Sequence, residues 1–349
     1  MTERLSAFQI QDAIAALIEP VHSRVQLTTV GYVEHKNQIY PLPLVCMGSA
    51  DPAAPAVAYV GGVHGLERIG TEVVLAFLRS LVGRMLWDKS LNLLLEQVHV
   101  VFMPMVNPVG LQQRRRSNGN GVDLMRNAPV DALSRVPWLI GGHRISPHLP
   151  WYRGAAHRPM ETEAQSLCQT MQEQLFGRPL AIAIDCHSGF GLLDRIWFPF
   201  ASQHAPAPHL AEAFALRKLF NDTYPQHSFY RMEPQSVIYC THGDLWDYLY
   251  QQHLQQHLQP QQATFLPFTL EMGSWTWVQK NPSQLFSLFG HFNPVLPHRL
   301  ERVLRRHLTL LNFLLQAAAA GPAWLPDGPM RTRYTLAALE RWYPDHRGF

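Results

Sequence analysis

The stretch YVGGVHGLERIGTEVV, residues 59–74, joins an apolar run to an amphipathic segment through a glycine-rich turn. The apolar run Ala56–Gly61 is continuous, which is typical of a strand buried on both faces of a sheet. Apolar residues then recur at helical spacing through 71–82. His64 and Glu67 lie in the turn between them. The stretch therefore predicts a strand-to-helix unit of an α/β sheet, with polar side chains beyond the carboxyl end of the strand.

Further apolar runs and amphipathic segments alternate along the rest of the chain. Continuous apolar runs cover 98–105, 180–185 and 265–270, and helical patterns cover 161–176 and 296–320. Strands that alternate with helices predict a mixed or parallel sheet wrapped by helices. The N-terminal residues 1–20 have the pattern of an amphipathic helix rather than of a signal peptide.

Composition narrows the class of protein. The chain has 349 residues, of which 47% are hydrophobic and 16% charged, and this balance indicates a compact globular enzyme. The net charge of +3 is small, and the basic run 114–116 is too short to indicate a nucleic-acid surface. No apolar run approaches the length of a membrane span. The four cysteines are far apart, with no CxxC pair. We therefore expect a cytoplasmic protein with reduced thiols and neither nucleic acid nor membrane as partner; the oligomeric state stays open.

The tract QQHLQQHLQPQQ, residues 251–262, is the one low-complexity segment. Its histidines and leucines recur every four residues, so it predicts an exposed helix or an insertion. Histidine-rich tracts can bind metal, but the favoured interpretation is a solvated helix face.

Two histidines and a glutamate follow predicted strands. His64 and Glu67 stand three residues apart after the first strand, and His187 follows the apolar run of LAIAIDCHSGFG, residues 180–191. Carboxyl ends of neighbouring strands meet at one edge of an open α/β sheet. Imidazole and carboxylate are zinc ligands, and a catalytic zinc keeps a position open for water. Each motif alone is weak, but together they indicate a metal centre.

Two more segments carry groups that suit hydrolysis. The loop NPVGLQQRRRSNGNGVDLMRN, residues 107–127, is rich in arginines, which grip carboxylates bidentately. Glu271 ends the apolar strand of FTLEMGSW, residues 268–275. A carboxylate at such a strand end can exchange protons with a metal-activated water.

These segments, in this order, resemble the zinc metallocarboxypeptidases, the carboxypeptidase A family. The resemblance covers roughly residues 57–271 and rests on HxxE, Asn-Pro-x-Gly, NGVDLMRN, His-Ser and Thr-x-Glu. It implies a single α/β domain with a mixed, mostly parallel twisted sheet of eight strands flanked by helices. We expect an N-terminal helical segment at 1–24, the catalytic domain at 25–320 and a C-terminal extension at 321–349.

The resemblance also implies roles for particular residues. It implies one zinc ion per chain, with His64, Glu67 and His187 as its ligands and Asp123 as the acceptor of the second ring proton of His64. Glu271 would be the general base and acid, and Arg116 would stabilise the oxyanion. The implied substrate-binding residues are Arg126, Asn107 and Tyr239. The substrate would be a peptide or N-acyl amino acid with a free carboxylate.

Met125 departs from the family pattern, and Trp246 occupies a position that sets specificity in the family. Met125 stands where the family has an asparagine that helps Arg126 hold the terminal carboxylate, and a thioether has no hydrogen to donate. Trp246 occupies the position that lines the pocket for the terminal side chain. A side chain of this size favours a small or apolar terminal residue.

Three alternatives to a carboxypeptidase stay open. The motif GGVHGLE also resembles aspartoacylase and succinylglutamate desuccinylase, which are deacylases of N-acyl amino acids, whereas NGVDLMRN favours the peptidases. An amidase of cell-wall peptides is a second alternative. A zinc-retaining binding protein without catalysis is the third, and Met125 is the feature that favours it.

Overall fold

The computed structural model describes residues 5–256 and 263–344, and in these ranges eight strands form one sheet. The strands are β1 (Val25–His35), β2 (Gln38–Gly48), β3 (Ala56–Gly61), β4 (His99–Met103), β5 (Leu180–Ser188), β6 (Asp194–Phe198), β7 (Tyr230–Pro234) and β8 (Thr264–Met272). Their order is β1-β2-β4-β3-β5-β8-β6-β7. β4, β3, β5 and β8 run parallel in the centre, while β1–β2, β2–β4 and β6–β8 are antiparallel pairs. The sheet is therefore mixed, as expected.

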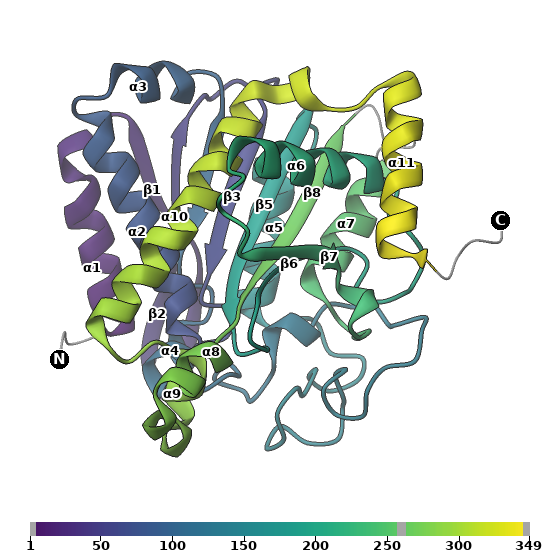
Figure 1. The fold of residues 1–349 in the computed structure, drawn as a ribbon. Coiled ribbons are helices and arrows are strands. Elements are labelled where there is room, and N and C mark those ends of the chain that lie inside the picture. The colour runs from purple at the N-terminus through teal and green to yellow at the C-terminus, as the bar shows by residue number, and fades with distance from the viewer. Residues whose placement is uncertain (1–4, 257–262, 345–349) are drawn as a thin grey trace.

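Helices cover both faces of the sheet (Figure 1). On one face, α2 (Arg68–Met85) and α10 (Pro297–Ala320) contact β3 and β5. On the other, α5 (Thr162–Leu175) and α7 (Leu245–Gln256) pack against each other and the strands. The remaining helices are α1 (Ala7–Ile18), α3 (Lys89–Leu95), α4 (Pro108–Gln113), α6 (Leu210–Thr223), α8 (Trp275–Lys280), α9 (Leu288–Phe292) and α11 (Gly328–Trp342). The architecture is a single α/β domain. Among the described residues, no helix combines the length and hydropathy that crossing a bilayer requires.

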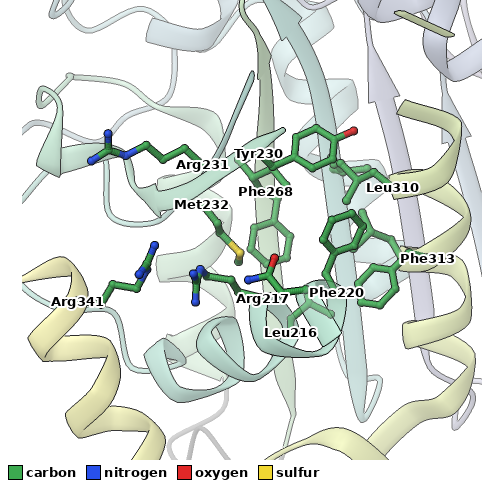
Figure 2. Close-up of a pocket in the computed structure, with 14 residues that line it drawn as sticks. Leu216, Arg217, Phe220, Tyr230, Arg231, Met232, Phe268, Leu310, Phe313 and Arg341 are labelled. Carbon is green, nitrogen blue, oxygen red and sulfur yellow. The ribbon is translucent and has the colours of Figure 1, made fainter. Parts of the chain in front are cut away.

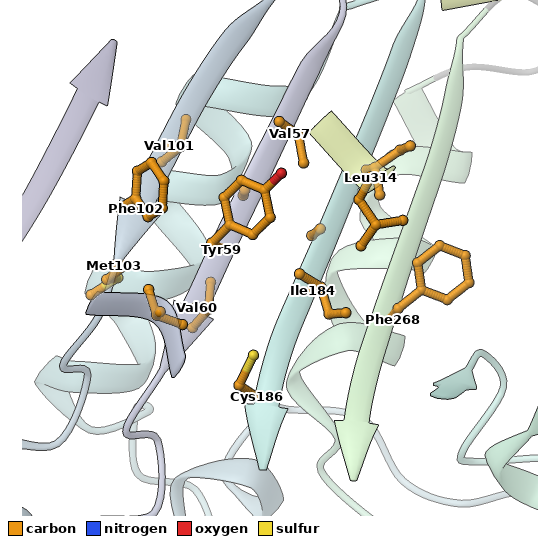
Figure 3. Close-up of a cluster of buried hydrophobic side chains, with 14 of the residues drawn as sticks. Val57, Tyr59, Val60, Val101, Phe102, Met103, Ile184, Cys186, Phe268 and Leu314 are labelled. Atoms are coloured by element: carbon orange, nitrogen blue, oxygen red, sulfur yellow. The ribbon is translucent and has the colours of Figure 1, made fainter. Parts of the chain in front are cut away.

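The central strands form the middle of the core. All residues of β3, β5 and β8 are buried, which explains why these strands read as unbroken apolar runs. Figure 3 shows Tyr59 of β3 beside Phe102 of β4, and their rings stack with centroids 5.0 Å apart. The Tyr59 hydroxyl donates to the carbonyl of Leu311, 2.9 Å away in α10. This bond satisfies a polar atom that the core would otherwise leave unpaired.

The structure adds detail that the sequence patterns did not supply in two regions, the β1–β2 hairpin and the segment after residue 320. The hairpin of β1 and β2, which no apolar run predicted, turns at Lys36 and Asn37, both with positive φ. The segment after residue 320 includes α11, which packs on α6, and the Trp342 indole donates to the Met232 carbonyl at 2.8 Å.

The solvated-face interpretation of the tract 251–262 agrees with the exposure of Gln255 and Gln256 but is wrong for His253. His253 on α7 is 1% exposed, its Nε2 lies 3.1 Å from the carbonyl oxygen of Ala263, and its ring packs against Phe176 and Phe265. The helix therefore turns this histidine into the core. Residues 257–262 of the tract lie outside the described residues.

Candidate metal and substrate site

The turn after β3 is held against the end of β5 by a close backbone approach. A Cβ atom on Gly70 would lie 2.0 Å from the carbonyl oxygen of Cys186, so only glycine lets the first turn of α2 rest on β5. Asn293 fastens the same turn, because its Nδ2 donates to the Leu66 carbonyl at 2.8 Å and its Oδ1 accepts from the amide of Ile69 at 2.9 Å. These contacts bring Glu67 next to His187.

His64, Glu67 and His187 converge on one point. His64 Nδ1 lies 2.9 Å from Glu67 Oε1, His187 Nδ1 lies 3.1 Å from Glu67 Oε2, and the two Nδ1 atoms are 3.2 Å apart. All three side chains are at most 4% exposed. With zinc–ligand bonds of about 2.0–2.2 Å, tetrahedral ligands lie roughly 3.3 Å apart. The three separations are close to this value, so the group has the spacing of a zinc site.

The outer nitrogen of each imidazole is bonded to a buried aspartate. His64 Nε2 lies 2.9 Å from Asp123 Oδ1, and His187 Nε2 lies 2.7 Å from Asp185 Oδ2. If each Nε2 carries the ring proton, each Nδ1 has a free lone pair. These two lone pairs lie next to each other and to the carboxylate of Glu67. Despite burial, Asp185 and Glu67 raise the pKa of His187, and the histidines lower the pKa of Glu67. The cluster therefore favours a positive charge at its centre, and its donor set fits zinc.

Glu271 lies beside this cluster on the neighbouring strand. It pairs in register with His187 across β5 and β8 and is 8% exposed. Burial and the negative charge of Glu67 raise its pKa to about 8. A bound cation would lower that pKa, because opposite charge favours the ionised carboxyl. Its place and its tunable pKa suit a group that takes up and returns a proton.

Arg116 bridges two of the acidic groups. Its Nη1 donates to Glu67 Oε1 at 2.9 Å and its Nε to Asp123 Oδ2 at 2.8 Å. A guanidinium has five N–H donors, so these bonds leave Nη2, which has no partner among the described residues. Arg116 is thus held beside the cluster, and its Nη2 remains able to donate hydrogen bonds to a ligand.

Arg126 and Tyr239 lie close to each other, near Glu271 and Arg116. Arg126 is 5% exposed, and its Nη1 donates to the Met125 carbonyl at 3.3 Å. Burial raises the pKa of Tyr239, while the nearby charge of Arg126 opposes that rise. A Cβ atom on Gly243 would lie 1.9 Å from the carbonyl oxygen of Arg126, so this glycine permits the close packing behind the arginine.

Tyr239 also lines a cavity of about 650 Å³ that the sequence analysis did not predict. The long loop of residues 135–145 forms one wall, and the segment 236–240 forms the other. Trp138, Ile145 and Val237 are exposed there. This loop has no periodic pattern, so its sequence held no signal of a binding surface. The cavity has the size of a pocket for an organic ligand.

Asn107 and Trp246, which were predicted to contact the substrate, are both buried and bonded to other residues of the protein. Asn107 is fully buried and caps α4: its Oδ1 accepts from the Gly110 amide at 2.8 Å, and its Nδ2 donates to the Val63 carbonyl at 3.2 Å. This placement argues against contact with substrate, because its polar atoms are used to support the loop. Trp246 is buried too, and its indole donates to Asp185 Oδ2 at 3.0 Å.

Asp185 is the supporting residue that the sequence analysis missed. It is fully buried and bonds both His187 and Trp246. The signal is in the motif DCH at 185–187, because residues i and i+2 of a strand share a face. The predicted strand ended at residue 185, whereas β5 continues to Ser188.

Comparison with known proteins decides the family. Residues 10–279 match the family model described as Zinc carboxypeptidase. The chain belongs to this family. The match covers the converging His64, Glu67 and His187 and the neighbouring Glu271.

Individual relatives match over shorter segments. Carboxypeptidase SOL1 of Arabidopsis thaliana is 39% identical over 77 residues, which is 22% of this chain and 16% of that protein. Carboxypeptidase E of Caenorhabditis elegans is 30% identical over 156 residues, 41% of this chain and 32% of that protein. The matched segments thus span a third or less of these relatives.

Solved structures show the same fold. Carboxypeptidase A from Helicoverpa armigera superposes with a TM-score of 0.67 at 18% identity, covering 90% of this chain and 74% of that one. Thrombin-activatable fibrinolysis inhibitor gives a TM-score of 0.67 at 17% identity, with the same two coverages. At such identity the likeness concerns the fold alone.

Proposed function

We propose that this protein is a zinc-dependent carboxypeptidase that removes the C-terminal amino acid from peptides. The observation that carries this proposal is the buried cluster of His64, Glu67 and His187, in which two imidazole lone pairs and a carboxylate converge beside Glu271. Membership of the zinc carboxypeptidase family supports it.

The three ligands would hold one zinc ion per chain. Bound there, zinc supplies a Lewis acid that polarises the scissile carbonyl and lowers the pKa of water. Glu271 takes a proton from the attacking water and delivers it to the departing nitrogen. Arg116 donates from Nη2 to the oxygen on which negative charge develops. Asp123 and Asp185 keep the imidazoles of His64 and His187 oriented through their Nε2 atoms.

The free carboxylate of the substrate would be held by Arg126 and Tyr239. Met125 offers no side-chain hydrogen bond there, so carboxylate binding rests on fewer donors than the family pattern has. The cavity of about 650 Å³ beside Tyr239 favours a peptide over a small N-acyl amino acid, because it has room for residues that precede the terminal one.

The first experiment is elemental analysis of the purified protein together with His64→Ala. We expect about one zinc per chain in the wild type and its loss in the variant, because a site with two ligands binds zinc far more weakly. A wild type that neither contains zinc nor takes it up would contradict the ligand set.

The second experiment separates the activities. Peptides with free C-termini, N-acyl amino acids and cell-wall peptides are incubated with the wild type, and released amino acids are quantified. Release from ordinary peptides supports the proposal. Hydrolysis confined to N-acyl amino acids identifies a deacylase, and hydrolysis confined to cell-wall peptides an amidase. Full zinc occupancy without any hydrolysis identifies a binding protein.

A further inference from the structure

A cavity of about 210 Å³, which we call the α6–α10 cavity, lies between the sheet and the helices α6, α10 and α11. Ile184, Ile196 and Phe268 of the sheet line it, as do Phe220 of α6 and Phe313 of α10. Figure 2 shows Phe220 and Phe313 on one side of it and the guanidinium groups of Arg217 and Arg341 on the other. No residue of the candidate metal site is among its lining residues.

The charges beside this cavity are not balanced. Arg231 forms an ion pair, in which its Nε lies 2.8 Å from Glu233 Oε2, and Arg195 shares the same glutamate. Arg217 and Arg341 have no carboxylate within ion-pair distance in the described part of the chain. Burial and the positive charge of Arg341 lower the pKa of Arg217. The two guanidinium groups therefore repel each other at the edge of an apolar space.

An anion would relieve this repulsion. Guanidinium groups bind carboxylates through paired, charge-assisted hydrogen bonds, which are shorter and stronger than neutral ones. Apart from the three arginines, Asn221 and Tyr230, all residues that line the cavity are apolar, so most of the ligand beyond its head group must be apolar as well. A carboxylate on a hydrocarbon tail meets both requirements.

The volume limits the tail. A 150 Å³ apolar cavity holds benzene, which is roughly 25 Å³ per carbon, so the α6–α10 cavity of about 210 Å³ holds about eight carbons. We propose that the α6–α10 cavity binds a medium-chain fatty acid, with its carboxylate between Arg217 and Arg341 and its tail between Phe220, Phe268 and Phe313. This proposal is independent of the proposed peptidase activity, and its test uses no catalytic readout.

The probe is sodium octanoate, titrated into the purified full-length protein by isothermal titration calorimetry. We expect saturable binding of one octanoate per chain. The double variant Arg217→Gln/Arg341→Gln should bind octanoate at least about tenfold more weakly, since it loses the charge-assisted bonds. The matched control is Arg79→Gln/Arg302→Gln, which changes two exposed arginines that do not line the cavity and should bind like the wild type.

Folding of the double variant is checked by its thermal unfolding. Because the substitutions remove a repulsion and no ion pair within the described residues, we expect a Tm at least as high as that of the wild type. If the double variant nevertheless fails to fold, Arg217→Lys is used. This variant keeps the positive charge but loses the paired, planar N–H donors of the guanidinium group. It should therefore bind octanoate measurably more weakly than the wild type.

Tail length and charge give independent tests in the wild type. Butanoate should bind more weakly than octanoate, and dodecanoate should gain nothing further, because its tail exceeds the cavity. Octanol should bind more weakly than octanoate, and to the same extent in wild type and double variant. The proposal is overturned if octanoate shows no saturable binding up to about 10 mM, if the double variant binds it equally well, or if inorganic phosphate binds as tightly as octanoate.

Discussion

His187 and Glu271 are register partners on the adjacent parallel strands β5 and β8. Both residues are buried, and backbone hydrogen bonds of the central sheet fix the separation of their Cα atoms. A proposed metal ligand and the proposed proton carrier therefore stand on rigid elements rather than on loops, which favours precise positioning. Glu67 reaches the same point from the turn before α2, and its charge, added to the effect of burial, raises the pKa of Glu271.

Replacing Glu271 separates metal binding from proton transfer. Glu271→Gln keeps the shape of the side chain but removes its ability to accept a proton. We expect unchanged zinc content and a loss of about 10²–10⁴-fold in kcat, the usual contribution of a general acid–base group. Peptide hydrolysis and elemental analysis are measured together, and the matched control is Glu173→Gln, an exposed carboxyl on α5. Retention of most of the activity would exclude this role for Glu271.

Asp185 is expected to tune the metal site without touching the metal. Its Oδ2 lies 2.7 Å from His187 Nε2, so Asp185→Asn weakens the bond that orients this imidazole. Loss of such supporting bonds costs about 10–100-fold in metal affinity. A chelator competition titration measures the change. Asp222→Asn, an exposed carboxyl on α6, is the matched control and should bind zinc like the wild type. Equal affinity in the Asp185 variant would show that its contact is structural only.

Arg126 and Met125 should affect substrate binding more than turnover. Arg126→Gln removes the charge proposed to hold the terminal carboxylate, and we expect KM for peptides to rise about 10–100-fold. Met125→Asn restores an amide donor beside that arginine and should lower KM. Steady-state kinetics on peptides give both values, and thermal melts identify any variant that is misfolded. A larger effect of Arg126→Gln on kcat than on KM would place this arginine at the reacting atoms instead.

The sequence predicted the centre of the fold better than its edges. β3, β5 and β8 are buried on both faces, so their apolar runs were recognisable. β6 and β7 have five residues each, too few for a clear pattern. β1 is largely half-buried, and the turn between β1 and β2 at Lys36 and Asn37 lacks the usual glycine.

The site was predictable where motif spacing reflects local geometry. His64 and Glu67 share one turn, and Asp123 lies within hydrogen-bond distance of His64 as the resemblance implied. Asp185 escaped notice because the predicted strand stopped too early. Asn107 was misplaced because its burial depends on how α4 packs, which no local pattern encodes. The cavity beside Tyr239 depends in the same way on tertiary contacts of a long loop.

His307 is expected to make the fold sensitive to acid. It is 1% exposed on α10, with its Nδ1 2.9 Å from the Tyr230 hydroxyl. Burial lowers its pKa from 6.5 to about 4, against the opposing effect of Asp194. The folded state thus keeps His307 neutral at pH values where the unfolded chain binds a proton. This stabilisation is complete above pH 6.5, declines as the pH falls to about 4, and is constant below that.

The measurement is the free energy of unfolding of wild type and His307→Gln in urea between pH 4 and pH 8, without added zinc. The difference between the two proteins isolates His307, because other titrating groups contribute equally to both. We expect the wild type to lose on the order of 3 kcal/mol relative to the variant as the pH falls from 8 to 4. The matched control is His298→Gln, which replaces an exposed histidine on the same helix. A constant difference between wild type and His307→Gln would mean that His307 accepts its proton as readily in the folded chain as in the unfolded one.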